Sequence, residues 1–404
     1  MTDRSWPRAS QLAPLLRPRP GRPGVERRLA GAASIRDLRL LARRRAPRAV
    51  FDYTDGAAGE EVALRRASEA FGRVEFRSRV LRDVSDVDPS TTILGRTAEL
   101  PLVFAPTGFT RMMHTEGEGA VARVAVRAGI PYALSTMGTT SVEDLAAAAP
   151  EARLWFQLYL WRDRAASRDF VERARAAGYE ALVLTVDTPV PGARLRDVRN
   201  GLTIPPALSW RTFTEGALHP AWWFDLLTTE PLEFASLHRF EGTVAELVGR
   251  MFDPSVTMSD VSWLRSVWPG SLVVKGIQDV EDARAVVDAG ADAVVVSNHG
   301  GRQLDRSAVP LESLPAVLDA VGDRAEVYVD GGILSGSDLV AAVALGARAG
   351  LVGRAYLYGL MAGGEGGVQR AADILLAEVR TTMALLGVTR VEQLGRDHVH
   401  LRPR

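Results

Sequence analysis

A histidine and an arginine, His299 and Arg302, lie close together in the stretch Ser297-Asn298-His299-Gly300-Gly301-Arg302-Gln303-Leu304-Asp305. A histidine can accept a proton near neutral pH, and the planar guanidinium of an arginine binds a carboxylate through two hydrogen bonds. The two glycines between them permit positive φ and a close approach of the backbone. The chemistry that this spacing allows is removal of a proton from an anionic substrate. A structural histidine in a glycine turn is the alternative interpretation.

The elements around this stretch follow a regular pattern. The apolar run Ala293–Val296 before it predicts a buried strand, and similar runs alternate with Ala-rich helical segments from residue 101 onward. The predicted strands are 101–106, 131–136, 154–160, 181–187, 272–277, 293–298, 326–330 and 350–353. The predicted helices are 116–128, 141–148, 165–177, 279–289, 311–321, 336–346 and, near the C-terminus, 366–387.

Strands that alternate with helices form a parallel sheet with right-handed crossovers. Eight such units predict an α/β fold, a closed (β/α)8 TIM barrel; a doubly wound open sheet is the rival. No strand is followed by a G-x-G-x-x-G turn that opens a helix, which disfavours a Rossmann dinucleotide site. We expect an N-terminal helical and arm extension before the barrel and a long insertion after its fourth strand.

All eight predicted strands have polar or glycine residues at or just after their C-terminal ends, where the active sites of barrels lie. A strand cap explains each one alone, but all eight at one end indicate a single ligand across the barrel mouth. The residues are Pro106, Thr107 and Gly108; Ser135; Gln157 and Tyr159; Thr185 and Asp187; Lys275; Ser297 and His299; Asp330, Gly331 and Gly332; Gly353 and Arg354.

The loops after the last two strands hold a phosphate in many barrels. Here the glycines of 330–332 and 353–354 free backbone N–H groups, and Arg354 can neutralise the charge. Lys275 can place positive charge beside a ring atom that becomes anionic on reduction. Three further side chains suit the polar edge of a planar heterocycle: Ser135, Gln157 and Thr185. A sugar phosphate, as in many barrel isomerases, is the alternative ligand.

A second group of residues suits a carboxylate with a neighbouring hydroxyl group. It comprises Tyr53, Tyr159, Arg194 and Arg302. Asp187 can orient His299 and stabilise its imidazolium form, as carboxylates do in histidine-based catalysis. For Tyr53 an ordinary place in the hydrophobic core is the alternative.

Composition bounds the function. The chain has 404 residues, 47% hydrophobic and 24% charged, and its formal net charge is zero, so we expect no nucleic-acid partner. The absence of cysteine excludes disulfides, zinc–thiolate sites and iron–sulfur clusters, and we expect no metal site. No run approaches ~18 apolar residues, and the N-terminus lacks the apolar core of a signal peptide. We therefore expect a cytoplasmic protein.

Two segments lie outside the barrel pattern. Residues 1–33 are rich in Pro and Arg, and we expect a basic arm that is extended, poorly ordered or wrapped over the surface, followed by the barrel domain over 34–404. The insertion, 190–262, contains a group of large apolar residues: Trp210, Trp222, Trp223, Phe224, Leu226, Leu227, Pro231 and Phe234. A lid or subunit contact is one interpretation of 205–236. The other is a peripheral contact with the inner face of the cell membrane, since Trp and Phe favour the bilayer interface.

The stretch Ser297–Asp305 resembles the active-site signature of the FMN-dependent α-hydroxy-acid dehydrogenases and oxidases. The resemblance runs from about residue 34 to the C-terminus, and several motifs match in order: Phe51-Asp52-Tyr53, Ala105-Pro106-Thr107-Gly108, Phe156-Gln157-Leu158-Tyr159, Leu184-Thr185-Val186-Asp187-Thr188-Pro189, Val274-Lys275-Gly276 and Val329-Asp330-Gly331-Gly332. The basic arm, the insertion and the stretch Gly353-Arg354-Ala355-Tyr356-Leu357-Tyr358-Gly359 are most similar to actinobacterial L-lactate dehydrogenases of the quinone-linked type.

The resemblance implies an enzyme that oxidises an L-2-hydroxy acid, above all L-lactate to pyruvate, and passes the electrons to a quinone or similar acceptor. It implies a homotetramer. His299 would take the Cα proton, or the hydroxyl proton if hydride leaves Cα, with Asp187 as its partner. Arg194 and Arg302 would bind the substrate carboxylate. Tyr53 and Tyr159 would hydrogen-bond the carboxylate and the hydroxyl group.

The remaining residues would hold FMN, with Lys275 near the N1–C2=O edge of the ring. They are Pro106, Thr107, Gly108, Ser135, Gln157, Thr185, Lys275, Ser297, Asp330, Gly331, Gly332, Gly353 and Arg354. The alternatives are an oxygen-using 2-hydroxy-acid oxidase, a mandelate-type dehydrogenase and a flavin-free phosphate-binding barrel.

The sequence departs from the family pattern at two positions. Leu334 stands where many members have an arginine that helps to hold the phosphate, so Arg354 and the backbone must carry more of that charge. Met137 stands where glycolate-type oxidases have tryptophan. A flexible methionine leaves room for the methyl group of lactate, and it also adapts to a larger aryl group.

Overall fold

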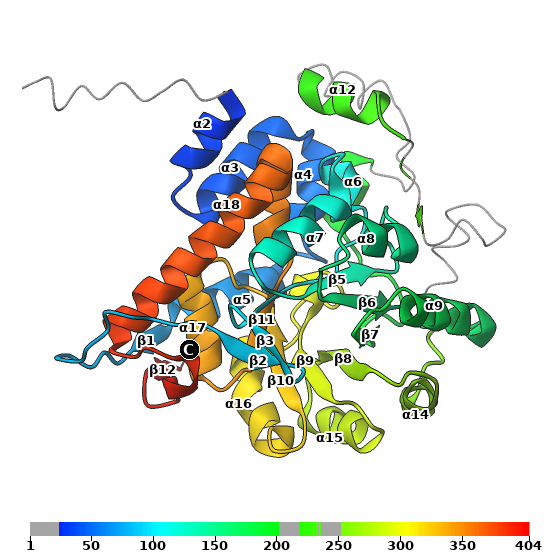
Figure 1. Cartoon of the computed structure of the whole chain (residues 1–404). Coiled ribbons are helices and arrows are strands. Elements are labelled where there is room, and N and C mark those ends of the chain that lie inside the picture. The colour runs from blue at the N-terminus through cyan, green and yellow to red at the C-terminus, as the bar shows by residue number, and fades with distance from the viewer. Residues whose placement is uncertain (1–23, 202–218, 231, 233, 236–251, 404) are drawn as a thin grey trace, which may run out of the picture.

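The centre of this computed structural model, which describes residues 24–201, 219–230, 232, 234–235 and 252–403, is a closed barrel of parallel strands (Figure 1). Around the barrel the strands follow the order β10-β11-β4-β5-β6-β7-β8-β9. They are β4 Leu102–Phe104, β5 Tyr132–Ser135, β6 Leu154–Leu158, β7 Ala181–Thr185, β8 Ser271–Ile277, β9 Ala293–Val296, β10 Glu326–Asp330 and β11 Ala349–Val352. Each coincides with a predicted strand, so the (β/α)8 TIM barrel is confirmed and the open sheet is excluded.

Helices return the chain between the strands, as their Ala-rich sequences predicted. The side chains of Ser141, Asp163 and Ser335 accept backbone N–H groups at the first turn of the helix that each begins, which satisfies donors that have no partner inside the helix. The helices are α6 Thr110–Met113, α7 Gly117–Arg127, α8 Val142–Ala148, α9 Arg164–Ala176, α15 Val280–Asp288, α16 Pro310–Val321 and α17 Gly336–Ala344, with 3₁₀ turns η2 His299–Gly301 and η3 Val391–Gln393.

The N-terminal end of the barrel is closed by a hairpin that the sequence pattern did not predict. Its strands, β2 Thr91–Ile93 and β3 Arg96–Ala98, lie outside the alternation of strands and helices and have three residues each. Ile93 packs into the barrel interior together with Trp155 and Tyr328, whose ring centroids are 6.0 Å apart. The hairpin therefore seals the end of the barrel opposite to the predicted site.

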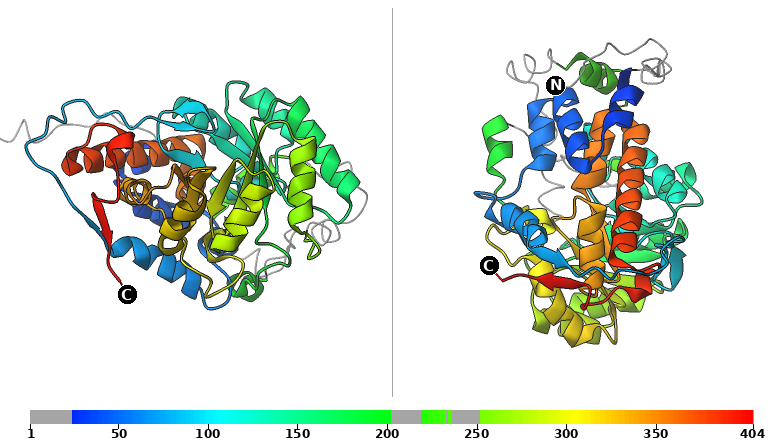
Figure 2. Two further views of the ribbon diagram at one scale, coloured as in Figure 1. Left: turned by 90° about the horizontal axis from the view of Figure 1, so that it is seen from below. Right: turned by 90° about the vertical axis from the view of Figure 1, so that its left-hand side faces the viewer.

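From residue 24, where the described chain begins, four helices precede the barrel: α2 Gly24–Gly31, α3 Ile35–Arg45, α4 Arg48–Asp55 and α5 Val62–Gly72. The expectation of an extended arm is wrong for 24–31, because these residues form α2; the arm residues 1–23 lie outside the described residues. The apolar side of α2, with Leu29 buried, packs on α18, and α3 lies along the same helix (Figure 2). Packing on a neighbouring helix thus outweighs the low helix preference of this glycine-rich segment.

The last helix begins much earlier than predicted. The prediction was 366–387, whereas α18 runs over Arg354–Leu386, with non-helical backbone at Gly363 and Gly364. Glycines weaken a helical pattern in sequence, and here they mask the first half of the helix. After α18, β12 Val399–Leu401 pairs with β1 Val74–Phe76. The early start of α18 places Arg354 at its N-terminus, in the barrel mouth.

The predicted insertion leaves the barrel after β7 and returns before β8. Its described helices are α10 Leu195–Asn200, α12 Pro220–Leu227 and α14 Met258–Val267, while Trp210 and Pro231 lie outside the described residues. Trp222 anchors α12, because its indole N–H donates to the carbonyl of Met112 at 3.0 Å. Phe224 and Leu227 of α12 are 68% and 70% exposed. None of the helices in the described ranges is long and apolar enough to cross a bilayer.

The hairpin at the closed end of the barrel predicts a change in stability without a change in activity. Ile93→Ala removes a fully buried side chain and should lower the free energy of unfolding by about 2–5 kcal/mol. Turnover should stay near the wild-type value, because the site lies at the other end. Urea unfolding checks this, with Thr92→Ala, an exposed position on the same strand, as the control. Equal losses in the two variants would contradict a packed seal.

Candidate active site

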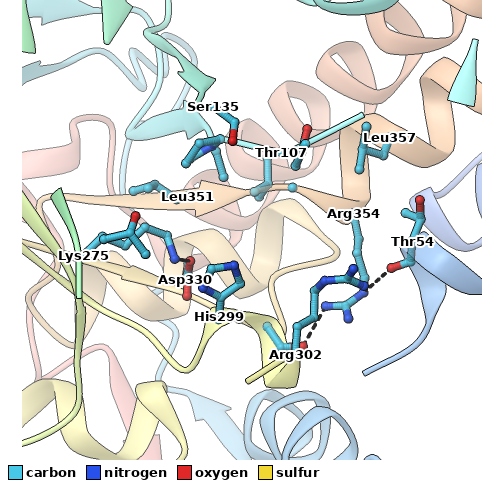
Figure 3. A pocket seen from close by; sticks show the side chains of 18 of the residues that line it. Thr54, Thr107, Ser135, Lys275, His299, Arg302, Asp330, Leu351, Arg354 and Leu357 are labelled. Atoms are coloured by element: carbon cyan, nitrogen blue, oxygen red, sulfur yellow. Dashed lines mark hydrogen bonds and ion pairs between the residues drawn. The ribbon is translucent and has the colours of Figure 1, made fainter. Parts of the chain in front are cut away.

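A hollow of about 1180 Å³, its open mouth included, lies at the C-terminal ends of the barrel strands (Figure 3). Seventeen of the nineteen predicted site residues line it: Tyr53, Pro106, Thr107, Gly108, Ser135, Gln157, Tyr159, Thr185, Arg194, Lys275, His299, Arg302, Asp330, Gly331, Gly332, Gly353 and Arg354. The two others, Asp187 and Ser297, lie behind this wall and contact the residues that form it. The structure therefore brings the whole predicted set together.

His299 and Asp187 form a hydrogen-bonded pair of the kind that can take up a proton. The Nδ1 atom of His299 lies 3.0 Å from Oδ1 of Asp187, which leaves Nε2 free to accept a proton. Burial lowers the pKa of His299 and outweighs the opposing effect of Asp187, so the ring is neutral at neutral pH. Burial alone would raise the pKa of Asp187, but His299 and Lys275 hold it below its usual value. Asp187 is therefore an anion, and it holds the neutral ring of His299 through one hydrogen bond.

A strained turn points His299 into the hollow. His299 itself has φ of 57°, in the left-handed region that non-glycine residues rarely adopt, and Gly300 follows with φ of 61°. The Asn298 side chain accepts the N–H of Gly301 at 3.1 Å, and the Ser297 hydroxyl accepts the N–H of His299 at 3.0 Å. Such strain persists where surrounding contacts impose it, typically at functional sites.

Arg194, Arg302 and Tyr53 form a positively charged corner of the hollow. The guanidinium carbons of Arg302 and Arg194 lie 4.8 Å and 5.8 Å from the centre of the Tyr53 ring. Burial, with Arg194 and Arg354 nearby, lowers the pKa of Arg302, although a guanidinium keeps its charge at neutral pH. Burial also raises the pKa of Tyr159, which stays a neutral hydrogen-bond donor. This corner suits a carboxylate beside a hydroxyl group.

The opposite wall presents polar atoms that have no partner within the described chain. Gln157 accepts the Ser135 hydroxyl at 2.9 Å through Oε1, so its amide NH₂ group faces the hollow, and Nε2 is buried without a hydrogen bond. The hydroxyl group of Thr185 and Oδ1 of Asp330 are buried and unpaired in the same way. Buried polar groups normally find partners. A ligand with donors and acceptors along one planar edge would supply them.

Lys275 adds a buried positive charge beside these atoms. Its Nζ lies 2.8 Å from Oδ2 of Asp330 (Figure 3). It also donates to the Ser297 hydroxyl at 2.8 Å. Burial alone would lower the pKa of Lys275, but Asp330 and Asp187 outweigh it and raise the pKa. The ammonium group can therefore stabilise negative charge on a ring placed in the hollow.

The part of the hollow where a phosphate was predicted differs from the expectation in the contacts of Arg354. Gly331 and Gly332 have φ of 88° and 94°, conformations that favour glycine, and they turn the chain at the rim. Arg354, however, donates to the carbonyl groups of Thr54, Gly300 and Gly56 at 2.9, 3.0 and 2.7 Å. Three of its five N–H groups are thereby used, and two remain for an anion. Leu334, also in the wall, adds no charge there.

Some wall residues were missed in the sequence. They are Thr54, Leu64, Ser68, Ile333, Leu351, Val352 and Leu357, besides Met137 and Leu334, which were noted as departures from the family pattern. Thr54, Leu64 and Ser68 come from α4 and α5, before the barrel, where no alternation of strands and helices indicated the rim. Spacing along α5 alone could not distinguish Ser68 from a solvent-exposed serine.

The residues of the hollow fit FMN. Unpaired atoms of Gln157, Thr185 and Asp330 match the polar edge of the isoalloxazine ring, and Lys275 can place charge beside it. Glycine-lined turns and the spare N–H groups of Arg354 lie where a phosphate can bind. These groups lie in one (β/α)8 barrel mouth together with the His299–Asp187 pair and with two arginines that can bind an anion. The fold and the site therefore indicate a flavin-dependent oxidoreductase that acts on anionic substrates.

Comparison with known proteins gives the family. The family model for FMN-dependent dehydrogenases matches residues 42–401, so the chain belongs to this family, as its motifs predicted. Its cofactor is FMN, and its substrate is a small 2-hydroxy acid.

Three similar proteins illustrate the relationship. A Mycobacterium tuberculosis (strain ATCC 25618 / H37Rv) protein, named as a proposed L-lactate dehydrogenase, is 57% identical over 98% of this chain and 96% of its own. The L-lactate dehydrogenase of Caulobacter vibrioides (strain NA1000 / CB15N) is 46% identical over 90% of this chain and 96% of its own. The crystal structure of the monotopic membrane protein (S)-mandelate dehydrogenase superposes with a TM-score of 0.89 at 37% identity, covering 92% of this chain and all of that one.

The His299–Asp187 pair predicts the acid limb of the pH profile. Because burial lowers the pKa of His299, kcat/KM for a 2-hydroxy acid should rise with pH through a pKa below ~6.5 and be level near neutrality. Steady-state kinetics across pH checks this. In Asp187→Asn the group that raises the His299 pKa is gone, so the limb should move to lower pH while kcat falls. A limb above the ordinary histidine pKa in the wild-type enzyme would contradict a neutral buried base.

Proposed function

We propose that this protein oxidises L-lactate to pyruvate on bound FMN and passes the electrons to a membrane quinone or a similar acceptor. The observation that carries the proposal is the position of the free Nε2 of His299 in the same hollow as Arg194, Arg302 and Tyr53. A base beside a carboxylate site is what removal of a proton from a 2-hydroxy acid requires.

Each side chain then has a defined task. Arg194 and Arg302 bind the carboxylate, and Tyr53 and Tyr159 donate hydrogen bonds to the carboxylate and the hydroxyl group. His299 takes one proton from the substrate, from Cα or, if hydride leaves Cα, from the hydroxyl group, and Asp187 stabilises the resulting imidazolium. FMN, when bound, accepts the two electrons that the substrate loses. Lys275 supplies positive charge near the ring edge.

At the other end of the hollow, the proposed FMN phosphate is held by the backbone of 331–332 and 353 and by Arg354. Because Leu334 adds no charge there, Arg354 has to supply the cation, through the N–H groups that its carbonyl contacts leave free. Ser297 is proposed to act from behind the wall, where it holds both Lys275 and the backbone of His299.

The preferred side chain of the substrate is proposed as the methyl group of lactate, because the relatives with 57% and 46% identity are named for L-lactate. The second candidate is (S)-mandelate, for which the structural neighbour is named. Met137 is the wall residue that can adapt to either, and the backbone of Gly108 packs closely against it: a Cβ on Gly108 would lie 2.9 Å from that of Met137.

The test is the absorbance of the purified protein under anaerobic conditions, before and after L-lactate is added. Oxidised flavin should bleach and should stay bleached when air is admitted, as expected for a dehydrogenase. Rapid recovery of the colour with formation of peroxide would make it an oxidase. A flavin that responds to (S)-mandelate alone would favour the mandelate reaction.

The same assay tests the base. The His299→Ala variant should retain its flavin, but L-lactate should reduce that flavin about 10²–10⁴ times more slowly than in the wild type. The matched control is His400→Ala. His400 is an exposed histidine on β12 that does not line the hollow. Reduction of the His299→Ala flavin at the wild-type rate would show that another group removes the proton.

We further propose that α12 touches the inner face of the cell membrane and that the enzyme is a tetramer. The exposed Phe224 and Leu227 support a membrane contact. The ion pair between Arg45 and Asp225, at 2.5 Å, joins α12 to the basic end of α3, where Arg43 and Arg44 are exposed. Apolar side chains beside arginines suit an anionic lipid surface.

Sedimentation with anionic lipid vesicles checks the membrane contact. The variant Phe224→Ser/Leu227→Ser should lose most of the bound fraction, because it removes the exposed apolar side chains of α12. The control is Leu385→Ser, at a 71% exposed position near the C-terminal end of α18, and it should bind to vesicles as the wild type does. Equal binding by all three proteins would place the membrane contact elsewhere. Light scattering of the enzyme in solution gives the subunit number.

A further inference from the structure

The helix α10 carries the substrate arginine, yet apolar packing does not hold it in place. Arg194 is its N-cap, and all six helical residues are at least partly exposed. The Nε atom of Arg194 is itself buried without a hydrogen bond in the described part of the chain. A six-residue helix is not stable alone. Other contacts must fix the position of Arg194 relative to Tyr53.

Arg196, two residues after Arg194, makes these contacts through three carboxylates. Its Nη1 lies 3.0 Å from Oδ2 of Asp55 and 3.4 Å from Oδ1 of Asp52, and its Nη2 lies 2.5 Å from Oε2 of Glu61. Asp52 and Asp55 belong to α4, and Glu61 precedes α5. One guanidinium therefore joins α10 to both segments of the N-terminal wall.

A second contact supports the same arrangement. The side-chain amide of Asn200, at the end of α10, donates to Oδ2 of Asp52 at 2.8 Å. At the other end, the N–H of Gly59 donates to the carbonyl of Ala193 at 2.9 Å. Both ends of α10 are thus tied to the segment that includes α4.

Asp55 is a fixed anchor for this arrangement. Its carboxylate accepts two hydrogen bonds from Arg39 on α3, at 2.5 and 2.9 Å, and one from the hydroxyl group of Tyr358 on α18, at 2.8 Å. Burial alone would raise the pKa of Asp55, but Arg39 and Tyr358 outweigh it and keep the carboxylate ionised. Asp55 would therefore stay in place if Arg196 were removed.

Arg196 lies outside the motifs that line the hollow, and its contacts give it a role of its own. We propose that Arg196 is a positioning residue: it clamps α10 onto α4 so that Arg194 and Tyr53 together form the carboxylate site. This inference rests on the proposed function in one respect, namely that a substrate carboxylate binds in that corner. Tyr53 lies on α4 between Asp52 and Asp55, so the clamp acts on the helix that carries this tyrosine.

The proposal predicts a change in binding and little change in chemistry. Arg196→Met should raise KM for L-lactate about tenfold with kcat within about twofold, because the carboxylate contact is used in the ground state and the transition state alike. The Kd of pyruvate, measured by its perturbation of the oxidised flavin spectrum, should rise by a similar factor. Flavin content should be unchanged and the thermal midpoint should fall only slightly, since the side chain of Arg196 is 32% exposed and Asp55 keeps its bonds to Arg39 and Tyr358.

Matched variants separate positioning from general damage. Arg199→Met removes an exposed arginine on the same helix and should leave KM and Kd at wild-type values. Glu61→Gln should raise KM less than Arg196→Met does. The double variant Arg196→Met/Glu61→Gln should be no worse than Arg196→Met alone, because neighbours in one network are not additive. Additive increases would show that the two residues act separately and would overturn the clamp.

Two further results decide the matter. Arg196→Lys keeps the charge and one contact, so it should recover part of the affinity. If Arg196→Met does not yield folded protein, Asn200→Ala, which removes only the bond to Asp52, should still raise KM and Kd in the same direction. Wild-type KM and Kd in Arg196→Met, or unchanged values in Asn200→Ala, would overturn the proposal.

Failure of the proposed function would look different. If L-lactate does not bleach the wild-type flavin, the substrate assignment fails, and the clamp is then tested with (S)-mandelate as substrate in the same set of variants. If L-lactate bleaches the wild-type flavin but the Arg196 and Arg199 variants behave alike, the function stands and the clamp is wrong.

Discussion

The site depends on the pairing of charged groups that are buried at the barrel mouth. Lys275, Asp330 and Asp187 are each less than a tenth exposed, and isolated charges in such places are costly. The ammonium group of Lys275 compensates Asp330 at 2.8 Å, and His299 is hydrogen-bonded to Asp187 at 3.0 Å. These pairs can meet because β7, which precedes Asp187, and β8, β9 and β10 are successive neighbours in the barrel. The order of these strands in the sheet is thus a condition for the electrostatics of the site.

The arginines at the mouth serve both the fold and the ligand. Arg354 binds three backbone carbonyl groups of the segments around it, and Arg302 donates to the carbonyl groups of Tyr53 and Gly56. They therefore fasten the N-terminal wall to the barrel while they keep positive charge in the hollow. The lowered pKa of His299 suits its place beside Arg194 and Arg302. The imidazole is uncharged there, and the two guanidinium groups can attract an anion. The N-terminal helices α4 and α5 are consequently part of the wall of the hollow.

The insertion has a divided character. Its first residues are polar, and Arg196 ties them by ion pairs to Asp55 of α4 and to Glu61 before α5. Its later residues are apolar: Trp222 and Phe234 are buried against the α6 region, where the Phe234 and Phe109 rings are 4.3 Å apart, and Phe224 and Leu227 are exposed. Phe109 in turn packs edge-on against Tyr53, with ring centroids 6.5 Å apart. The apolar part of the insertion thus exposes side chains at the surface and also packs, through Phe109, against the tyrosine that lines the hollow.

The sequence by itself determined the barrel, because the alternation of apolar strands and Ala-rich helices admits few other topologies. It also determined which residues lie at the rim, since the carboxyl ends of parallel strands share one end of a barrel. Only the tertiary structure decided the rest. The hairpin that seals the barrel, the helix 24–31 and the first half of α18 depend on packing against distant segments, which short strands and glycine-rich runs do not reveal. The wall residues Leu64 and Ser68, the carbonyl contacts of Arg354 and the network of Arg196 and Asp55 join parts of the chain more than a hundred residues apart. No local spacing encodes such contacts, because they exist only once the chain has closed on itself.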